Sequence, residues 1–97
     1  MSRTLIERRL KDVSDRLKTV THDLAVAEDQ LAHLADEANE ARLRALVSET
    51  PLAGKDHREA QRHAQAMCRH RDELVAEVRQ LEAAQDGLLD RLVAAGT

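Results

Sequence analysis

Residues 6–45 read IERRLKDVSDRLKTVTHDLAVAEDQLAHLADEANEARLRA, and this stretch decides the fold. Apolar residues recur in it at alternating steps of four and three, at Ile6, Leu10, Val13, Leu17, Val20, Leu24, Ala27, Leu31, Leu34, Ala38, Ala41 and Ala45. This spacing places one apolar side chain after another along a single face of an α-helix. The stretch therefore predicts a long helix that packs against a second helix through a heptad seam.

The second half of the chain repeats the pattern. Its positions with the same spacing are Ala60, Ala64, Met67, Arg71, Leu74, Val78, Leu81, Gln85, Leu88, Leu92 and Ala95. Arg71 and Gln85 interrupt this apolar stripe, and such polar seam residues penalise wrong pairings at some cost in stability. Because arginine has a long aliphatic stem, Arg71 can also carry its charge out of the seam, toward Glu37.

The break between the two halves is Ser48-Glu49-Thr50-Pro51-Leu52-Ala53-Gly54. A residue before proline avoids the helical conformation, so Thr50 marks the end of the first helix and is a good N-cap for the next. Asp56, with Glu59 three residues later, offers another helix start. We expect one all-α domain over residues 1–97, an antiparallel coiled-coil hairpin with helices over about 4–49 and 56–95 and a turn over about 50–55.

The pairing of the two helices can be expressed as a sum of residue numbers, because that sum is constant for facing residues of an antiparallel hairpin. A sum of 105 pairs Gln85 with Val20 and centres the turn just after Leu52. Sums of 98 and 112, one heptad away on either side, would centre the turn on Glu49 or on Asp56. We expect the sum of 105, since it agrees with the proline and glycine that flank the turn.

Some apolar residues lie beyond the seam. Cys68, Val75 and Leu89 each follow a seam position by one residue, and Leu43, Leu46 and Val47 lie near the turn. A seam that contains many alanines and no aromatic residue buries little apolar area. We therefore expect the hairpin to form a homodimer with a four-helix arrangement, or to dock on another helical protein.

The charges are grouped along the chain. Residues 19–41 hold six acidic residues and no Lys or Arg, and at a sum of 105 they lie beside the acidic run that includes Glu77, Glu82 and Asp86. Arg58, Arg62 and Arg69 belong to a basic region toward the turn. The net charge of −3 gives the whole chain no attraction to nucleic acid, so nucleic acid is not an expected partner.

The sequence lacks the usual marks of a chemical site. Cys68 is the only cysteine, and its neighbours His63, Met67 and His70 do not form a recognised metal-ligand motif. There is no phosphate-binding loop, nucleophile elbow or metalloprotease motif. We therefore expect no enzyme activity, no cofactor, and no catalytic or metal-binding residue. The absence of a long apolar stretch predicts no membrane segment and a cytoplasmic protein, and the richness in Arg and Ala suggests a bacterial source.

Two resemblances are architectural. The length and the central turn resemble small secreted effectors of the WXG100 type, although this turn reads Thr50-Pro51-Leu52-Ala53-Gly54 in place of their Trp-x-Gly. The hairpin is also similar to the coiled-coil fingers of Gre- and DksA-like factors, which enter RNA polymerase; their acidic tip pair is replaced here by Glu49, Lys55 and Asp56.

The expected function is that of a non-enzymatic interaction or scaffold module that associates with itself. Its interaction residues are taken to be Cys68, Val75 and Leu89. The alternative is a regulatory coiled-coil finger that acts on a nucleic-acid-handling machine through its basic tip. That alternative depends on the cationic side chains of Arg58, Arg62 and Arg69.

Overall fold

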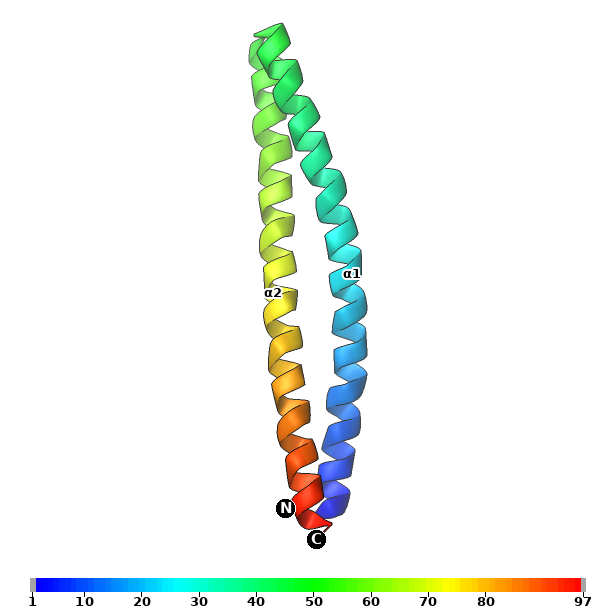
Figure 1. Cartoon of the computed structure of the whole chain (residues 1–97). Helices are drawn as coiled ribbons and strands as arrows, with labels where there is room; N and C mark the ends of the chain where they lie inside the picture. Colours follow the sequence, from blue (N-terminus) through cyan, green and yellow to red (C-terminus); the bar gives the residue numbers. More distant parts are fainter. Residues whose placement is uncertain (1, 97) are drawn as a thin grey trace. The chain divides into compact units, whose positions relative to one another are not determined.

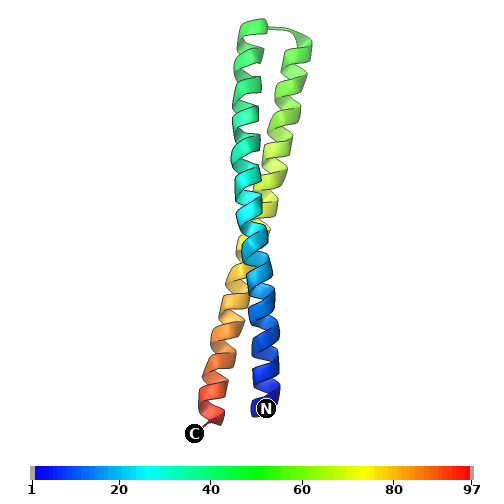
Figure 2. The same ribbon diagram turned by 90° about the vertical axis from the view of Figure 1, so that its right-hand side faces the viewer.

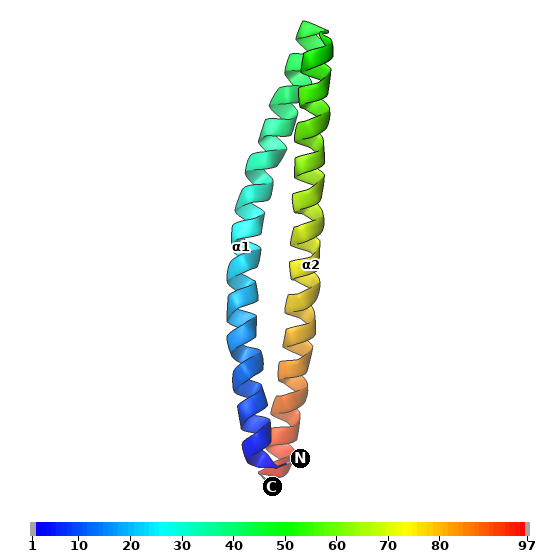
Figure 3. The same ribbon diagram turned by 180° about the vertical axis from the view of Figure 1, so that it is seen from behind.

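The computed structural model describes residues 2–96 of the 97-residue chain. Two long helices, α1 (Arg3–Ser48) and α2 (Pro51–Ala95), make up almost all of this range. They run in opposite directions and pack against each other, as Figures 1 and 3 show from opposite sides. The predicted all-α helical hairpin is confirmed, whereas dimerisation stays a prediction.

The contacts divide the hairpin into two units. Unit 1 combines α1 up to Leu24 with α2 from Leu74 onward, and unit 2 is the continuous segment Ala25–Glu73, which includes the turn. Within each unit, one stretch of α1 packs on one stretch of α2. Each unit therefore has its own part of the seam and its own exposed surface.

The seam follows the heptad positions of the sequence. All twelve predicted seam positions of α1 are buried or half-buried, and among the eleven of α2 only Ala95 is exposed. In unit 1 the most buried side chains of α1 are Ile6 and Val20, while Ala27 and Ala41 have this role in unit 2. The apolar period of the sequence thus determines which face of each helix is covered.

Ser2 caps the first helix. Its Oγ accepts a hydrogen bond from the backbone N–H of Leu5 at 3.2 Å, and its carbonyl oxygen accepts one from Ile6 at 3.0 Å. A serine side chain at this position satisfies a backbone donor that the helix itself leaves unpaired. The start of α1 at Arg3 therefore lies within one residue of the predicted start.

The turn consists of Glu49 and Thr50, and Figure 2 shows it as the short link between the helices. Glu49 adopts a left-handed conformation with φ of 50°, and its N–H donates to the carbonyl oxygen of Ala45 at 3.2 Å. This is the αL type of helix C-cap. Thr50 then caps α2, because its Oγ1 accepts a hydrogen bond from the N–H of Ala53 at 3.1 Å.

The predicted turn over residues 50–55 is too long. α2 already begins at Pro51, so residues 51–55 are helical. The reason is that proline is well tolerated in the first helical position, where no backbone N–H is needed and its fixed φ suits the helix. Of the two helix starts that the sequence offered, the N-cap at Thr50 is confirmed and the start near Asp56 is wrong.

The predicted pairing with a sum of 105 is also wrong. In unit 1, the side-chain amide of Gln85 donates a hydrogen bond to Oγ of Ser14 at 3.1 Å, and these residue numbers add to 99. A turn at Glu49 and Thr50 has the same sum. The helices are thus paired about one heptad away from the expected register, so that Gln85 lies beside Ser14 and not beside Val20.

Replacing Glu49 with glycine should stabilise the hairpin. A residue with a Cβ atom is strained in the left-handed region, and glycine relieves a strain of about 1 kcal/mol. We expect Glu49→Gly to raise the free energy of unfolding in urea by about that amount. Glu49→Ala is the matched control, because it removes the carboxylate but keeps Cβ. A gain in the alanine variant equal to that in the glycine variant would contradict a backbone origin.

The register can be checked by cross-linking. In a Cys68→Ala background, the pair Ser14→Cys and Gln85→Cys should form an intrachain disulfide under mild oxidation, because these side chains are in contact. The pair Val20→Cys and Gln85→Cys, which the sum of 105 brings together, should oxidise much more slowly. Mass spectrometry of alkylated samples measures both rates, and a reversed order would exclude the pairing seen in the structure.

Candidate functional site

The predicted interaction residues Cys68, Val75 and Leu89 are divided between the two units. Cys68 belongs to unit 2, whereas Val75 and Leu89 belong to unit 1. Cys68 and Val75 are half-buried at the edge of the seam, and Leu89 is 43% exposed. Of the three, only Leu89 is thus an exposed apolar residue.

Most of the exposed large apolar side chains form two groups, and Leu5 and Val26 are exposed outside them. In unit 1, Leu89 and Val93 lie one helical turn apart on α2, and Val93 is 70% exposed. In unit 2 the group consists of residues next to the turn, which we call the turn cluster: Leu43, Leu46, Val47 and Leu52. The members on α1 were recognisable in the sequence as apolar residues outside the seam, whereas Leu52 was assigned to the turn.

The turn cluster is the more exposed of the two groups. Val47 is 85% exposed, Leu46 63% and Leu43 48%, so α2 covers none of them well. Leu43 occupies the same heptad position as Asp29 and Asp36, which face away from the seam. Leucine at such a position gains little from the packing of the hairpin, and exposed apolar groups of this kind mark interaction surfaces.

Arg71 does not extend toward Glu37. Its Nε donates to Oδ1 of Asp72 at 2.7 Å, and its Nη2 donates to Sγ of Cys68 at 3.3 Å, so both partners lie on α2. The hydrogen bond to Asp72, followed by charge attraction, raises the pKa of Arg71 above its ordinary value. Glu37 lies instead 3.3 Å from Nε2 of His33, on its own helix.

Replacing Arg71 with leucine should raise the melting temperature. The Arg71 side chain is 32% exposed and occupies a seam position, while its partner Asp72 is well exposed and stays solvated when the arginine is lost. A leucine therefore adds apolar burial and leaves no buried charge unpaired. Thermal unfolding followed by circular dichroism measures the change.

Asp72→Asn is the matched control for Arg71→Leu, because it removes the charge partner and keeps the arginine. It should change the melting temperature little, since an exposed ion pair contributes little to stability. A clear fall for Arg71→Leu would show that the guanidinium group has a stabilising role in the seam.

Polar contacts between the helices occur in unit 1. Besides the Gln85 contact, Arg16 donates from Nε and Nη2 to Oε1 of Glu77, at 2.9 and 2.7 Å. Arg16 is more than half exposed, so this pair stabilises the fold by less than about 1 kcal/mol. Its position nevertheless shows that the basic part of α1 lies beside the acidic part of α2 in this unit.

The predicted grouping of the acidic residues needs correction. The acidic run that includes Glu77, Glu82 and Asp86 belongs to unit 1, whereas residues 25–41 of α1 belong to unit 2. In unit 2 this acidic segment shares the hairpin with the part of α2 that carries Arg58, Arg62 and Arg69. The cause is the shifted register, which moves each charged segment by about one heptad relative to its expected neighbour.

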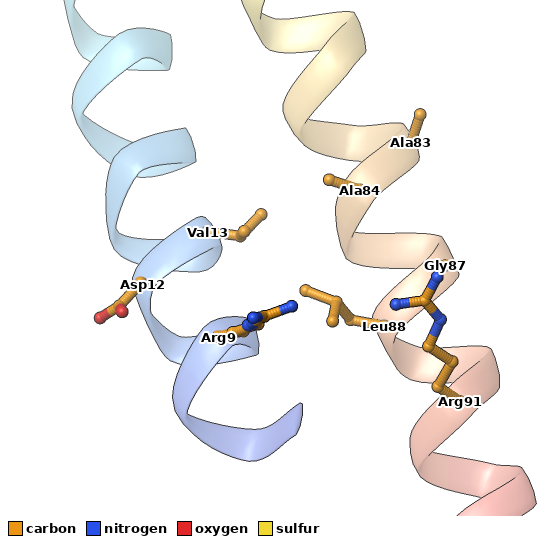
Figure 4. A pocket seen from close by; sticks show the side chains of 8 residues that line it. All are labelled: Arg9, Asp12, Val13, Ala83, Ala84, Gly87, Leu88 and Arg91. Atoms are coloured by element: carbon orange, nitrogen blue, oxygen red, sulfur yellow. The ribbon is translucent and has the colours of Figure 1, made fainter. Parts of the chain in front are cut away.

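Unit 1 contains a groove that the sequence did not predict (Figure 4). Its volume is about 500 Å³, and α1 contributes Arg9, Asp12 and Val13. α2 contributes the remaining residues, which are Ala83, Ala84, Gly87, Leu88 and Arg91. The groove exists because small residues follow one another there, and a Cβ atom at Gly87 would have no neighbour within 4 Å.

Arg9 and Arg91 give this groove a basic rim, while Val13 and Leu88 point toward each other across it (Figure 4). Alanine and glycine carry no chemical signal of their own in a sequence, so the pairing of the helices had to be known before the groove could be found.

The basic residues of the alternative prediction lie together in unit 2. Arg58, Arg62 and Arg69 are all exposed on α2, and Arg62 and Arg69 lie seven residues apart on one edge of the helix. They therefore occupy a common outer surface of this unit. A role for them in acting on a nucleic-acid-handling machine stays a prediction.

Within residues 2–96, no three side chains of His, Cys, Asp and Glu come together as metal ligands. Neither described helix has a stretch long and apolar enough to cross a bilayer.

The chain matches no protein-family model, and no significant similarity was found to a curated protein or to a solved structure. Proposals about its function therefore depend on the surfaces described above.

Proposed function

We propose that the chain is a non-enzymatic protein–protein interaction module that associates with itself. The observation that carries this proposal is the exposure of large apolar side chains outside the seam. These side chains are the turn cluster in unit 2 and the pair of Leu89 and Val93 in unit 1. Association would remove them from water and so supply a favourable free energy.

The composition of the seam gives a further reason for association. In unit 2 the buried side chains of α1 are Ala27 and Ala41, which remove little apolar area from water. The larger Leu43 and Leu46 on the same helix remain outside the seam. Unit 2 consequently has more to gain from a partner than from tighter packing of its own two helices.

Sedimentation equilibrium should show a mass that rises toward twice 10.8 kDa as the protein concentration increases through the micromolar range. Because binding of a second copy stabilises the folded state, the melting temperature should rise over the same range. A fully helical monomer at every concentration would contradict self-association. A monomer that binds a different helical protein would be an interaction module that does not associate with itself.

A further inference from the structure

We infer that self-association occurs through α1 of unit 2, which pairs antiparallel with α1 of a second copy about a two-fold axis near Ala35. This inference rests on the proposed self-association and specifies its surface. Three features of this stretch support the inference. Leucines are exposed at the end near the turn, small alanines are exposed at the other end, and the charge is positive at the leucine end and negative at the alanine end.

Three exposed residues define the edge of α1 in question. Glu28, Ala35 and Arg42 are each seven residues apart, so their side chains leave the helix on nearly the same side. Glu28 and Arg42 are therefore equidistant from Ala35. When two such edges meet antiparallel with Ala35 at the centre, Glu28 of each copy lies opposite Arg42 of the other.

Both charged residues are available for this pairing. Arg42 donates a hydrogen bond from Nη2 to Oδ1 of Asn39 at 3.1 Å, which is a neutral partner on its own helix. Within residues 2–96, Glu28 forms no ion pair or side-chain hydrogen bond. An ion pair between copies would therefore not have to break one inside the hairpin.

The apolar residues fit the same arrangement. Leu46 lies eleven residues after Ala35, and Ala25 lies ten before it, so the antiparallel pairing brings Leu46 of one copy onto Ala25 of the other. Leu43 of one copy then packs over the hole that Ala25, Glu28 and Ala32 form on the other copy. The small exposed alanines let the two helix backbones approach, and the exposed leucines fill the space at each end.

Other occupants fit this surface less well. A parallel second copy would place Glu28 against Glu28 and Arg42 against Arg42, and like charges in contact oppose association. An anionic membrane would repel Glu28 and would offer it no cationic partner, whereas a second copy offers Arg42. A two-fold pairing satisfies both charges at once and gives a closed dimer, in which the same patch is used by both copies.

Charge reversal tests the inference directly. Arg42→Glu and Glu28→Arg should each turn two attractive contacts per dimer into repulsive ones, so each should weaken dimerisation by about tenfold or more. The double variant Glu28→Arg with Arg42→Glu restores both pairs and should dimerise nearly as well as the original chain. An equimolar mixture of the two single variants should form a heterodimer more strongly than either variant forms a homodimer.

Sedimentation equilibrium measures the dissociation constants, and circular dichroism verifies that every variant remains helical. Arg8→Glu is the matched control, because it is the same charge reversal at an exposed position of unit 1. It should leave the dimer unchanged. Leu46→Gln should weaken the dimer more than Leu89→Gln, since only Leu46 lies in the inferred interface.

The outcomes separate the two proposals. If the original chain dimerises but neither single reversal affects the dissociation constant, the surface is wrong and self-association stands; strong weakening by Leu89→Gln would then place the interface in unit 1. If the mixture shows no preference for the heterodimer, the pairing of Glu28 with Arg42 is overturned. An original chain that stays monomeric, including one that binds anionic vesicles, would overturn self-association itself.

Discussion

The two-residue turn at Glu49 and Thr50 determines which side chains of α1 and α2 face each other. A heptad seam by itself allows pairings that differ by seven residues, because each shift places apolar positions opposite apolar positions again. The left-handed Glu49 and the N-cap at Thr50 leave no residues to spare between the helices. The contact between Gln85 and Ser14 in unit 1 has the same sum of residue numbers, so seam and turn agree.

The same register arranges the charges. In unit 2, the α1 part carries five acidic residues against two arginines, while Arg58, Arg62 and Arg69 lie on the α2 part. In unit 1 the order is reversed, and Arg16 of α1 binds Glu77 of α2. The net charge of the whole chain hides this alternation. Within each unit, long-range attraction between the helices therefore adds to the burial of the seam.

The sequence was sufficient for the helices and their buried faces, because the apolar period is long and regular. It was not sufficient for the register, since a seven-residue period leaves the pairing open, and Pro51 and Gly54 are tolerated inside the first turns of α2. A glutamate in the left-handed region at Glu49 gives no sequence signal at all. Of the predicted interaction residues, Leu89 is exposed, whereas Cys68 and Val75 are partly covered by the seam.

Near the turn, the distribution of large and small apolar residues in α1 is opposite to what a self-sufficient hairpin would need. There, alanine occupies the seam at Ala41 and Ala45, while Leu43 and Leu46 lie outside it. Exchanging the two kinds of residue would bury more apolar area without changing the composition. With leucines exposed and alanines buried near the turn, the hairpin is less stable alone than its composition allows, and the proposed partner on the outer face of α1 would remove that deficit.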